Sequence, residues 1–170
     1  NWRCIYCQVP DLKLGSAPEI DLTLLEKELR EFLNEVLNGD FYRRMEVPEN
    51  QRVIKDIAIA GNGEPTSLSN FDVAVELIGK IATELNVFPQ SHFVLITNGS
   101  LIHREVVQAG LKTLHNFGGE IWFKLDSATP QGRNLVNNSK QTNESVLKNL
   151  TLASQICETK IQIGLMDYQN

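Results

Sequence analysis

The sequence has few of the features that mark several common classes of protein. It contains three cysteines in 170 residues, an odd number with one close pair, which argues against a disulfide framework and favours a reducing, cytoplasmic location. No apolar run approaches the roughly 18 residues that span a bilayer, so we expect no membrane partner. Twenty-one acidic residues outnumber sixteen basic ones and give a net charge of −5, which excludes a broad basic face for nucleic-acid phosphates.

Several catalytic and nucleotide-binding motifs are also missing. Neither G-x-G-x-x-G nor G-x4-G-K-[ST] occurs, and there is no H-E-x-x-H and no legible Ser–His–Asp arrangement. We find no internal repeat and no low-complexity tract. The length and the 42% of hydrophobic residues suit one domain over residues 1–170 with a core of its own.

Hydrophobic periodicity predicts helices alternating with buried strands. Apolar residues recur at intervals of three and four over 21–38, 70–86, 101–115 and 143–157, which predicts four helices. Short apolar, mostly β-branched runs predict strands over 56–60, 92–97, 120–125 and 161–166, and we expect loops over 8–20, over 39–52 and in the Asn- and Gln-rich segment before residue 143. This order predicts an α/β fold of parallel βα repeats, either an open doubly wound sheet or an arc of a (β/α) barrel.

Three short polar stretches follow the carboxyl ends of the predicted strands, where such folds place their ligands. They are 61–66 (Gly-Asn-Gly-Glu-Pro-Thr), 97–99 (Thr-Asn-Gly) and 126–127 (Asp-Ser). The glycines of the first stretch let the backbone approach a ligand, and Glu64 can accept hydrogen bonds from an ammonium group. The alternative for this stretch is a tight strand–helix turn with a solvated carboxylate.

Two of the three cysteines, Cys4 and Cys7, lie at C-x-x-C spacing near the start of the chain. Such a pair is typical of a redox dithiol, half of a zinc site or part of an iron–sulfur site. A loop with proline and glycine follows the pair, which disfavours a thioredoxin-like dithiol, and there is no second C-x-x-C to complete a zinc site. We interpret Cys157, at a helix end, as a buried inert thiol, and Trp2 as a packing residue.

Taken together, the order C-x-Tyr6-C, strand–G-x-G-E-P-T, strand–T-N-G and strand–L-D resembles the radical S-adenosylmethionine (radical SAM) core, a partial (β/α)6 barrel. The resemblance spans essentially all 170 residues, and within that superfamily the sequence resembles Fe–S oxidoreductases related to wyosine-type tRNA-modifying enzymes. A cysteine directly ahead of Asn1 would complete the C-x3-C-x2-C signature. The resemblance also implies that the family's first strand precedes Asn1 and its last strand follows Asn170.

The resemblance implies two cofactors, a [4Fe-4S] cluster and S-adenosylmethionine, and it assigns residues to each. Cys4 and Cys7 match cluster ligands, and Tyr6 matches the aromatic residue near the adenine. The family's G-G-E triplet, which receives the methionyl amino group, falls on Asn62, Gly63 and Glu64, with Gly61 just ahead of an asparagine that replaces the first glycine. In the family, residues at strand ends line the site and often reach the ribose or the carboxylate; the matching positions here are Thr97, Asn98, Lys124, Asp126 and Ser127. Gln162 and Gly164 match the strand that commonly flanks the adenine.

The activity implied by the resemblance is radical generation. One electron from the reduced cluster cleaves S-adenosylmethionine to methionine and a 5′-deoxyadenosyl radical, which abstracts hydrogen from an unknown substrate: a small molecule, a protein or a tRNA. Flavodoxin or ferredoxin would donate the electron. With only two of three thiolates present, we expect residues 1–170 alone to hold a cluster weakly or not at all and to be inactive. The alternatives are a zinc-binding or thiol-redox α/β domain that uses Cys4 and Cys7, and a non-catalytic α/β interaction domain.

Overall fold

A computed structural model describes residues 2–11, 15 and 19–165. Four strands form one sheet in the order β1-β2-β3-β4, and every neighbouring pair is parallel. The strands are β1 (Asp56–Ile59), β2 (His92–Thr97), β3 (Glu120–Lys124) and β4 (Glu158–Gln162). The α-helices are α1 (Leu22–Asn38), α2 (Phe41–Arg44), α3 (Phe71–Glu84), α4 (Glu105–Asn116), α5 (Pro130–Asn137) and α6 (Asn143–Ile156), with 3-10 turns η1 (Glu49–Gln51) and η2 (Pro65–Ser67).

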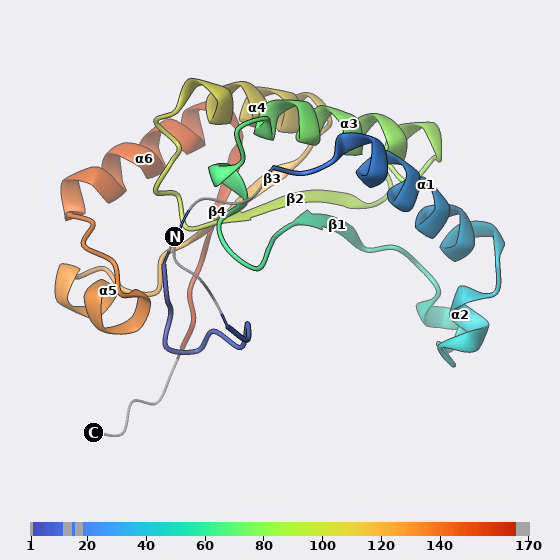
Figure 1. The fold of residues 1–170 in the computed structure, drawn as a ribbon, viewed down its shortest axis with the longest axis horizontal. Helices are drawn as coiled ribbons and strands as arrows, with labels where there is room; N and C mark the ends of the chain where they lie inside the picture. Colours follow the sequence, from blue (N-terminus) through green and yellow to red (C-terminus); the bar gives the residue numbers. More distant parts are fainter. Residues whose placement is uncertain (1, 12–14, 16–18, 166–170) are drawn as a thin grey trace.

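The strand order decides between the two α/β architectures that the sequence allows. A doubly wound sheet reverses its strand order at a switch point and carries helices on both faces. Here the strands follow one another in chain order, and α1, α3, α4 and α6 lie along one face of the sheet (Figure 1). The fold is therefore an arc of a (β/α) barrel, which confirms the predicted parallel βα repeats.

The helix-covered face of the sheet carries the core. The strand register places Ile57 beside Phe93, and Leu95 beside Ile121, on this face. Phe93, Leu95 and Ile121 are almost completely buried against the helices, together with Leu111 of α4. Burying one such side chain contributes roughly 1.5–3 kcal/mol, so this layer is the main source of stability.

The opposite face of β3 and β4 is polar, and no helix among the described residues covers it (Figure 1). Trp122 Nε1 donates to Glu120 Oε1 at 2.6 Å, and Lys160 on the neighbouring strand forms an ion pair with the same carboxylate. Burial opposes ionisation of Glu120, but its hydrogen bonds with Lys160 and Trp122 outweigh that effect and lower its pKa. This face corresponds to the inside of the barrel arc.

The observed helix ends agree with most of the predicted ones. Asp21 caps α1 by accepting hydrogen bonds from the backbone N–H groups of Thr23 and Leu24 at 2.9 and 3.0 Å, and Gly39 ends it. The helix predicted over 101–115 begins only at Glu105, after a turn. The 39–52 connection contains α2 and η1, which the sequence pattern did not indicate. Of the loop predicted over 8–20, residues 12–14 and 16–18 lie outside the described residues.

Two predictions near the end of the chain are wrong. The last strand occupies 158–162 instead of 161–166. The helix α6 is followed almost directly by this strand, which therefore begins earlier than predicted. Alternate residues of β4 lie on the polar face of the sheet, so the strand lacks the apolar run that the prediction relied on. Ile163 and Leu165, which suggested the later strand, are exposed, and Met166 lies outside the described residues. The segment expected to be a loop before residue 143 contains α5.

Cys157 is buried, as predicted. Its side chain is 3% exposed, and its Sγ donates to the Gly119 carbonyl at 3.2 Å, just ahead of β3. Burial raises the pKa of this thiol to about 11, so it is protonated near neutral pH. None of the helices in the part of the chain that the structure describes is long and apolar enough to cross a membrane.

Candidate active site

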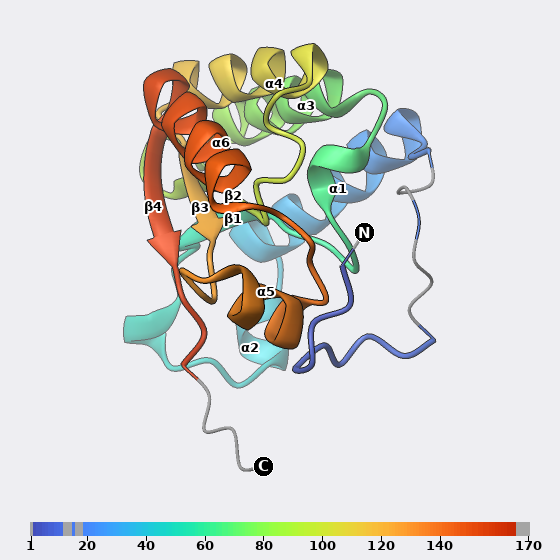
Figure 2. The same cartoon turned by 90° about the vertical axis from the view of Figure 1, so that its left-hand side faces the viewer.

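A cavity of about 360 Å³ lies at the carboxyl ends of the strands, where the N-terminal segment approaches the sheet. Figure 2 shows the strands β3 and β4 pointing towards this end of the molecule, where α5 also lies. The cavity is lined by Trp2, Cys4, Tyr6, Cys7, Val9, Ala60, Gly61, Gly63, Glu64, Ile96, Thr97, Asn98, Lys124 and Gln162. Residues far apart in the sequence therefore share one site.

Glu64 joins the turns that follow β1 and β2. Its Oε1 accepts hydrogen bonds from the hydroxyls of Thr66 at 2.6 Å and Thr97 at 2.5 Å, and its Oε2 accepts the backbone N–H of Asn98 at 2.9 Å. The residue is only 4% exposed, so the interpretation as a solvated turn carboxylate is wrong. A carboxylate oxygen can accept more than one hydrogen bond, so Oε2 retains capacity for a donor in the cavity.

The Thr97–Gly99 turn depends on its glycine and on a side chain from a distant helix. Gly99 has φ +70°, and a Cβ built on it would lie 2.1 Å from the Phe123 ring. Asn149 of α6 is buried and donates from Nδ2 to the Gly99 carbonyl at 2.8 Å. The turn is thus held from both sides, which fixes the Asn98 N–H against Glu64.

The cysteine segment forms a turn that is hydrogen-bonded to α5. The Cys7 N–H donates to the Cys4 carbonyl at 3.0 Å, and the Ile5 N–H donates to the Val136 carbonyl at 2.9 Å. Cys4 is half-buried and Cys7 is exposed, and both line the cavity. The turn therefore places both cysteines at the cavity.

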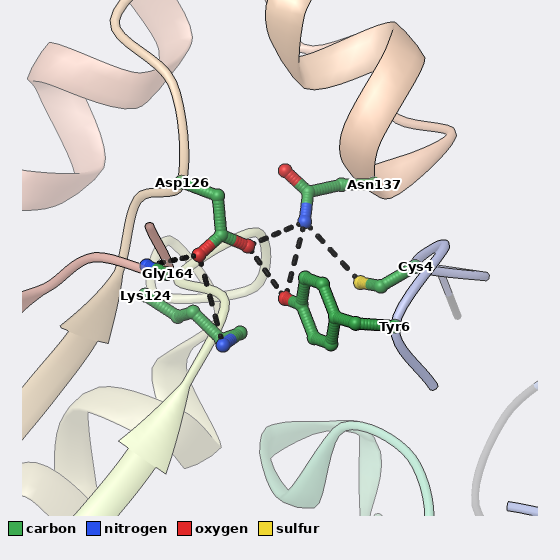
Figure 3. A network of polar contacts seen from close by, with 6 residues as sticks. All are labelled: Cys4, Tyr6, Lys124, Asp126, Asn137 and Gly164. Atoms are coloured by element: carbon green, nitrogen blue, oxygen red, sulfur yellow. Dashed lines mark hydrogen bonds and ion pairs between the residues drawn. The ribbon is translucent and has the colours of Figure 1, made fainter. Parts of the chain in front are cut away.

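A polar network around Asp126 connects the cysteine segment to the sheet (Figure 3). Tyr6 donates its hydroxyl to Asp126 Oδ2 at 2.5 Å, Asn137 Nδ2 donates to the same oxygen at 2.6 Å, and the Gly164 N–H donates to Oδ1 at 2.9 Å. Burial opposes ionisation of Asp126, but these hydrogen bonds and the Lys124 charge outweigh it and lower its pKa. Burial and the Asp126 carboxylate raise the pKa of Tyr6, which keeps its hydroxyl a donor.

Opposite charges lie on two walls of the cavity. Lys124 Nζ lies 3.7 Å from Asp126 Oδ1 and 4.6 Å from the centre of the Tyr6 ring, a cation–π contact. Glu64 lies on the other wall, at the carboxyl ends of β1 and β2. The cavity can therefore bind a ligand that carries both an ammonium and a carboxylate group.

Most of the residues selected from the sequence meet in this cavity. Eight of the predicted site residues line it: Cys4, Tyr6, Cys7, Gly61, Gly63, Glu64, Thr97 and Asn98. Lys124 and Gln162, expected near a cofactor, line it too, and so does Trp2, which we expected only to pack.

Three predicted cofactor-binding residues do not line the cavity. Asn62 is exposed in the turn after β1. Asp126 is occupied by its own hydrogen-bond network, which also takes up the Gly164 N–H. Ser127 lies at the start of α5, where its hydroxyl accepts the Thr129 N–H and its carbonyl accepts from Arg133. These residues support the site without facing it.

Asn137 is the member of the site that the sequence did not indicate. It is buried at the end of α5, a helix whose few apolar residues gave no periodic signal. Its signals were local: Thr129 at the N-cap, Pro130 at the first helical position and Asn138 in the left-handed conformation at the end. Those three residues predict a short helix, although not the contacts of Asn137.

The donor atoms near the cavity fit part of a metal cluster. Cys4 and Cys7 bring two cysteine side chains to it, whereas Cys157 is buried at the opposite end of the sheet. Within residues 2–11, 15 and 19–165, no group of three or more His, Cys, Asp or Glu side chains could hold a metal ion. Two cysteine ligands are compatible with an iron–sulfur site and with a zinc site, and both kinds of site need further ligands.

A wider hollow of about 590 Å³ lies at the other end of the sheet, beside α2 and the segments that lead into β1 and β2. It contains none of the predicted site residues. Parallel βα folds bind their ligands at the carboxyl ends of strands, which favours the smaller cavity as the functional one.

Comparison with known proteins agrees with this geometry. The family model described as the Radical SAM superfamily matches residues 1–170. No curated protein matches the chain.

Proposed function

Because the chain belongs to the radical SAM superfamily, we propose that it is the core of an enzyme that abstracts hydrogen from its substrate with a 5′-deoxyadenosyl radical. The observation that carries this proposal is the single cavity at the strand ends. It gathers the C-x-x-C segment with Tyr6, the Glu64 turn and the Thr97–Asn98 turn from three separate parts of the sequence.

Cys4 and Cys7 are the proposed ligands of a [4Fe-4S] cluster. When bound, the reduced cluster supplies the electron that cleaves S-adenosylmethionine into methionine and the 5′-deoxyadenosyl radical. The hydrogen bond from the Cys7 N–H to the Cys4 carbonyl keeps the two thiolates on one turn. A third thiolate would complete this proposed ligand set, and a cysteine directly ahead of Asn1 would supply it at C-x3-C-x2-C spacing.

The cavity walls suit the methionyl part of S-adenosylmethionine. Glu64 Oε2 accepts a hydrogen bond from the ligand's ammonium group, and Lys124 attracts its carboxylate. Gly63, at φ +152°, presents its backbone where no side chain intervenes. Tyr6 and Trp2 line the cavity and would provide aromatic surface beside the adenine.

The finer assignment is to Fe–S oxidoreductases related to wyosine-type enzymes, and it rests on the G-x-G-E-P-T, T-N-G and L-D order. The substrate class within this proposal is a small molecule, a protein or a tRNA. The electron donor is flavodoxin or ferredoxin. The low cysteine content supports a cytoplasmic location.

Reconstitution with iron and sulfide under anaerobic conditions tests the proposal. We would use an upstream-extended chain in which a cysteine precedes Asn1, and measure iron content and reductant-dependent formation of 5′-deoxyadenosine. We expect about four irons per chain and 5′-deoxyadenosine. Both are lost in Cys4→Ala and retained in the matched variant Cys157→Ala, whose thiol lies at the opposite end of the sheet.

The same measurement distinguishes the alternative. Zinc bound at one ion per chain without iron uptake would overturn the proposal in favour of a zinc domain that uses Cys4 and Cys7. Reversible oxidation of the pair without any metal would favour a thiol-redox domain instead.

A further inference from the structure

The side chain of Asn137 lies at the centre of the contacts that connect α5 to the cysteine segment (Figure 3). Its Nδ2 lies 2.6 Å from Asp126 Oδ2, 3.2 Å from Cys4 Sγ and 3.4 Å from the Tyr6 hydroxyl. The residue is only 2% exposed. A buried amide donor with three acceptors around it is held in one orientation, because few alternatives satisfy its hydrogens.

The two hydrogens of this amide have distinct partners. The Asp126 carboxylate, with its lowered pKa, is the strongest acceptor and takes one hydrogen. Tyr6 donates its own hydroxyl to Asp126, so it does not need the second hydrogen. The second hydrogen therefore points to Cys4 Sγ, with the Tyr6 oxygen close by.

The backbone reinforces this contact. Val136, the residue before Asn137, accepts the Ile5 N–H at 2.9 Å, so neighbouring residues of α5 bind the cysteine turn through both backbone and side chain. Within the part of the chain that the structure describes, no side chain donates a hydrogen bond to Cys7 Sγ, and Cys7 is exposed. The two thiolates of the site are therefore unlike in their surroundings.

We propose that Asn137 is a positioning residue of the iron–sulfur site: its amide donates to Cys4 Sγ and sets the reduction potential of the cluster that this thiolate binds. The effect on the reduction potential rests on the proposed function, because it requires a bound cluster. The contact between Asn137 and Cys4 does not depend on it. A hydrogen bond to a ligand sulfur stabilises its negative charge, more so when the cluster has gained an electron, and so raises the reduction potential.

The contact is tested first in the metal-free chain with its thiols kept reduced. The side-chain amide signals of Asn137 in a ¹H–¹⁵N spectrum are identified by their loss in Asn137→Leu. We expect Cys4→Ala to move these signals and Cys7→Ala to leave them in place. The proposal would be overturned if the Asn137 amide chemical shifts did not change in Cys4→Ala, or if they changed equally in Cys4→Ala and Cys7→Ala. This outcome does not depend on whether the chain binds a cluster.

The effect on the cluster is tested by redox titration of the reconstituted, upstream-extended chain, followed by electron paramagnetic resonance. Asn137→Leu keeps the shape of the side chain without its donor, and we expect a lower midpoint potential. Asn134→Leu makes the same change at an exposed position of α5, and we expect no shift. An unchanged midpoint in Asn137→Leu, or an equal shift in both, would refute the role.

The two tests also separate this inference from the proposed function. Absence of any cluster in the wild-type extended chain would remove the proposed function, and the amide signals would still decide the contact. A normal cluster with an unshifted potential in Asn137→Leu would remove the inference alone.

Discussion

Gly99 follows β2 with a positive φ, in a position where its lack of a side chain matters twice. A Cβ would strain the backbone at φ +70° and would also meet the Phe123 ring. Gly118 has nearly the same φ, +71°, but open space where its Cβ would be. Comparing alanine substitutions at Gly99 and Gly118 therefore separates the energetic cost of the positive φ from the cost of the clash with Phe123.

We therefore expect Gly99→Ala to lower the free energy of unfolding by about 2–4 kcal/mol, and Gly118→Ala by about 1 kcal/mol. Urea denaturation measures both. Gly99→Ala also displaces the Asn98 N–H from Glu64, so it should weaken binding of S-adenosylmethionine, whereas Gly118→Ala should not. Equal losses of stability in the two variants would contradict the packing argument.

Site residues whose partners lie nearby in the sequence, or at the end of a neighbouring strand, were the easiest to predict. Glu64 was chosen because it follows glycines at a strand end, and its contacts with Thr66 lie two residues away. Its contacts with Thr97 and Asn98 follow from the rule that parallel strands place their carboxyl ends together. Asn137 was missed because its partner Cys4 lies 133 residues away, and no periodicity or motif links the two.

At the scale of elements, α5 depends on one buried arginine. Arg133 is 2% exposed and donates to the Ser127 carbonyl at 3.1 Å, the Gln141 carbonyl at 3.0 Å and Asn143 Oδ1 at 2.7 Å. No carboxylate among the described residues forms an ion pair with it, and its Nε has no partner there. The guanidinium holds both ends of a helix that has little apolar surface of its own.

Arg133→Ala should cost about 2–4 kcal/mol, because it removes three charge-assisted hydrogen bonds and leaves a cavity. Hydrogen exchange should accelerate first across 127–143. Arg43→Ala provides the control, since Arg43 is exposed beside Asp40 and its loss should cost under about 0.5 kcal/mol. Uniform acceleration over the whole chain, without a local effect at α5, would contradict the role of Arg133.

The element predictions succeeded where burial sets the pattern. The strands β1, β2 and β3 and the helices α1, α3 and α6 are packed into the core, so hydrophobic periodicity places them within a few residues. The strand β4 lies at the sheet edge with exposed Glu158 and Lys160, and α5 is held by polar contacts. Neither has a continuous apolar side, so the apolar pattern placed β4 too late in the sequence and gave no signal for α5.

For the whole molecule, the choice of a barrel arc required the structure, because helices and strands alternate equally in both α/β architectures. The strand order and the single layer of helices on one face of the sheet identify the fold as a barrel arc. The third thiolate has no counterpart in the described residues. The cavity therefore contains the residues that we propose for S-adenosylmethionine more completely than those that we propose for the cluster.

The stability of the whole molecule should depend on pH through Asp126, which links the N-terminal segment, β3, α5 and the end of the chain after β4. Its folded-state pKa is lower than the ordinary value of 3.8. A carboxylate with a lowered pKa contributes stability that is complete above its unfolded pKa and is lost as pH falls through the folded one. The contribution of Asp126 is therefore fully present at neutral pH, begins to fall as pH drops below about 3.8, and is lost only below the lower folded-state pKa.

Asp126→Asn should be less stable than the wild type at pH 7 by about 1–3 kcal/mol, because the charge is lost and an NH2 group replaces one of the two acceptor oxygens, so that it faces a donor. The difference should narrow as pH falls below 3.8, because Asp126 of the unfolded wild type then takes up a proton that the folded protein, with its lower pKa, does not yet bind. Urea denaturation at pH 7, 5, 4 and 3 measures it, with the exposed Asp40→Asn as a control that changes stability by under about 0.5 kcal/mol. A gap that stays constant down to pH 3 would show that the charge of Asp126 does not stabilise the fold.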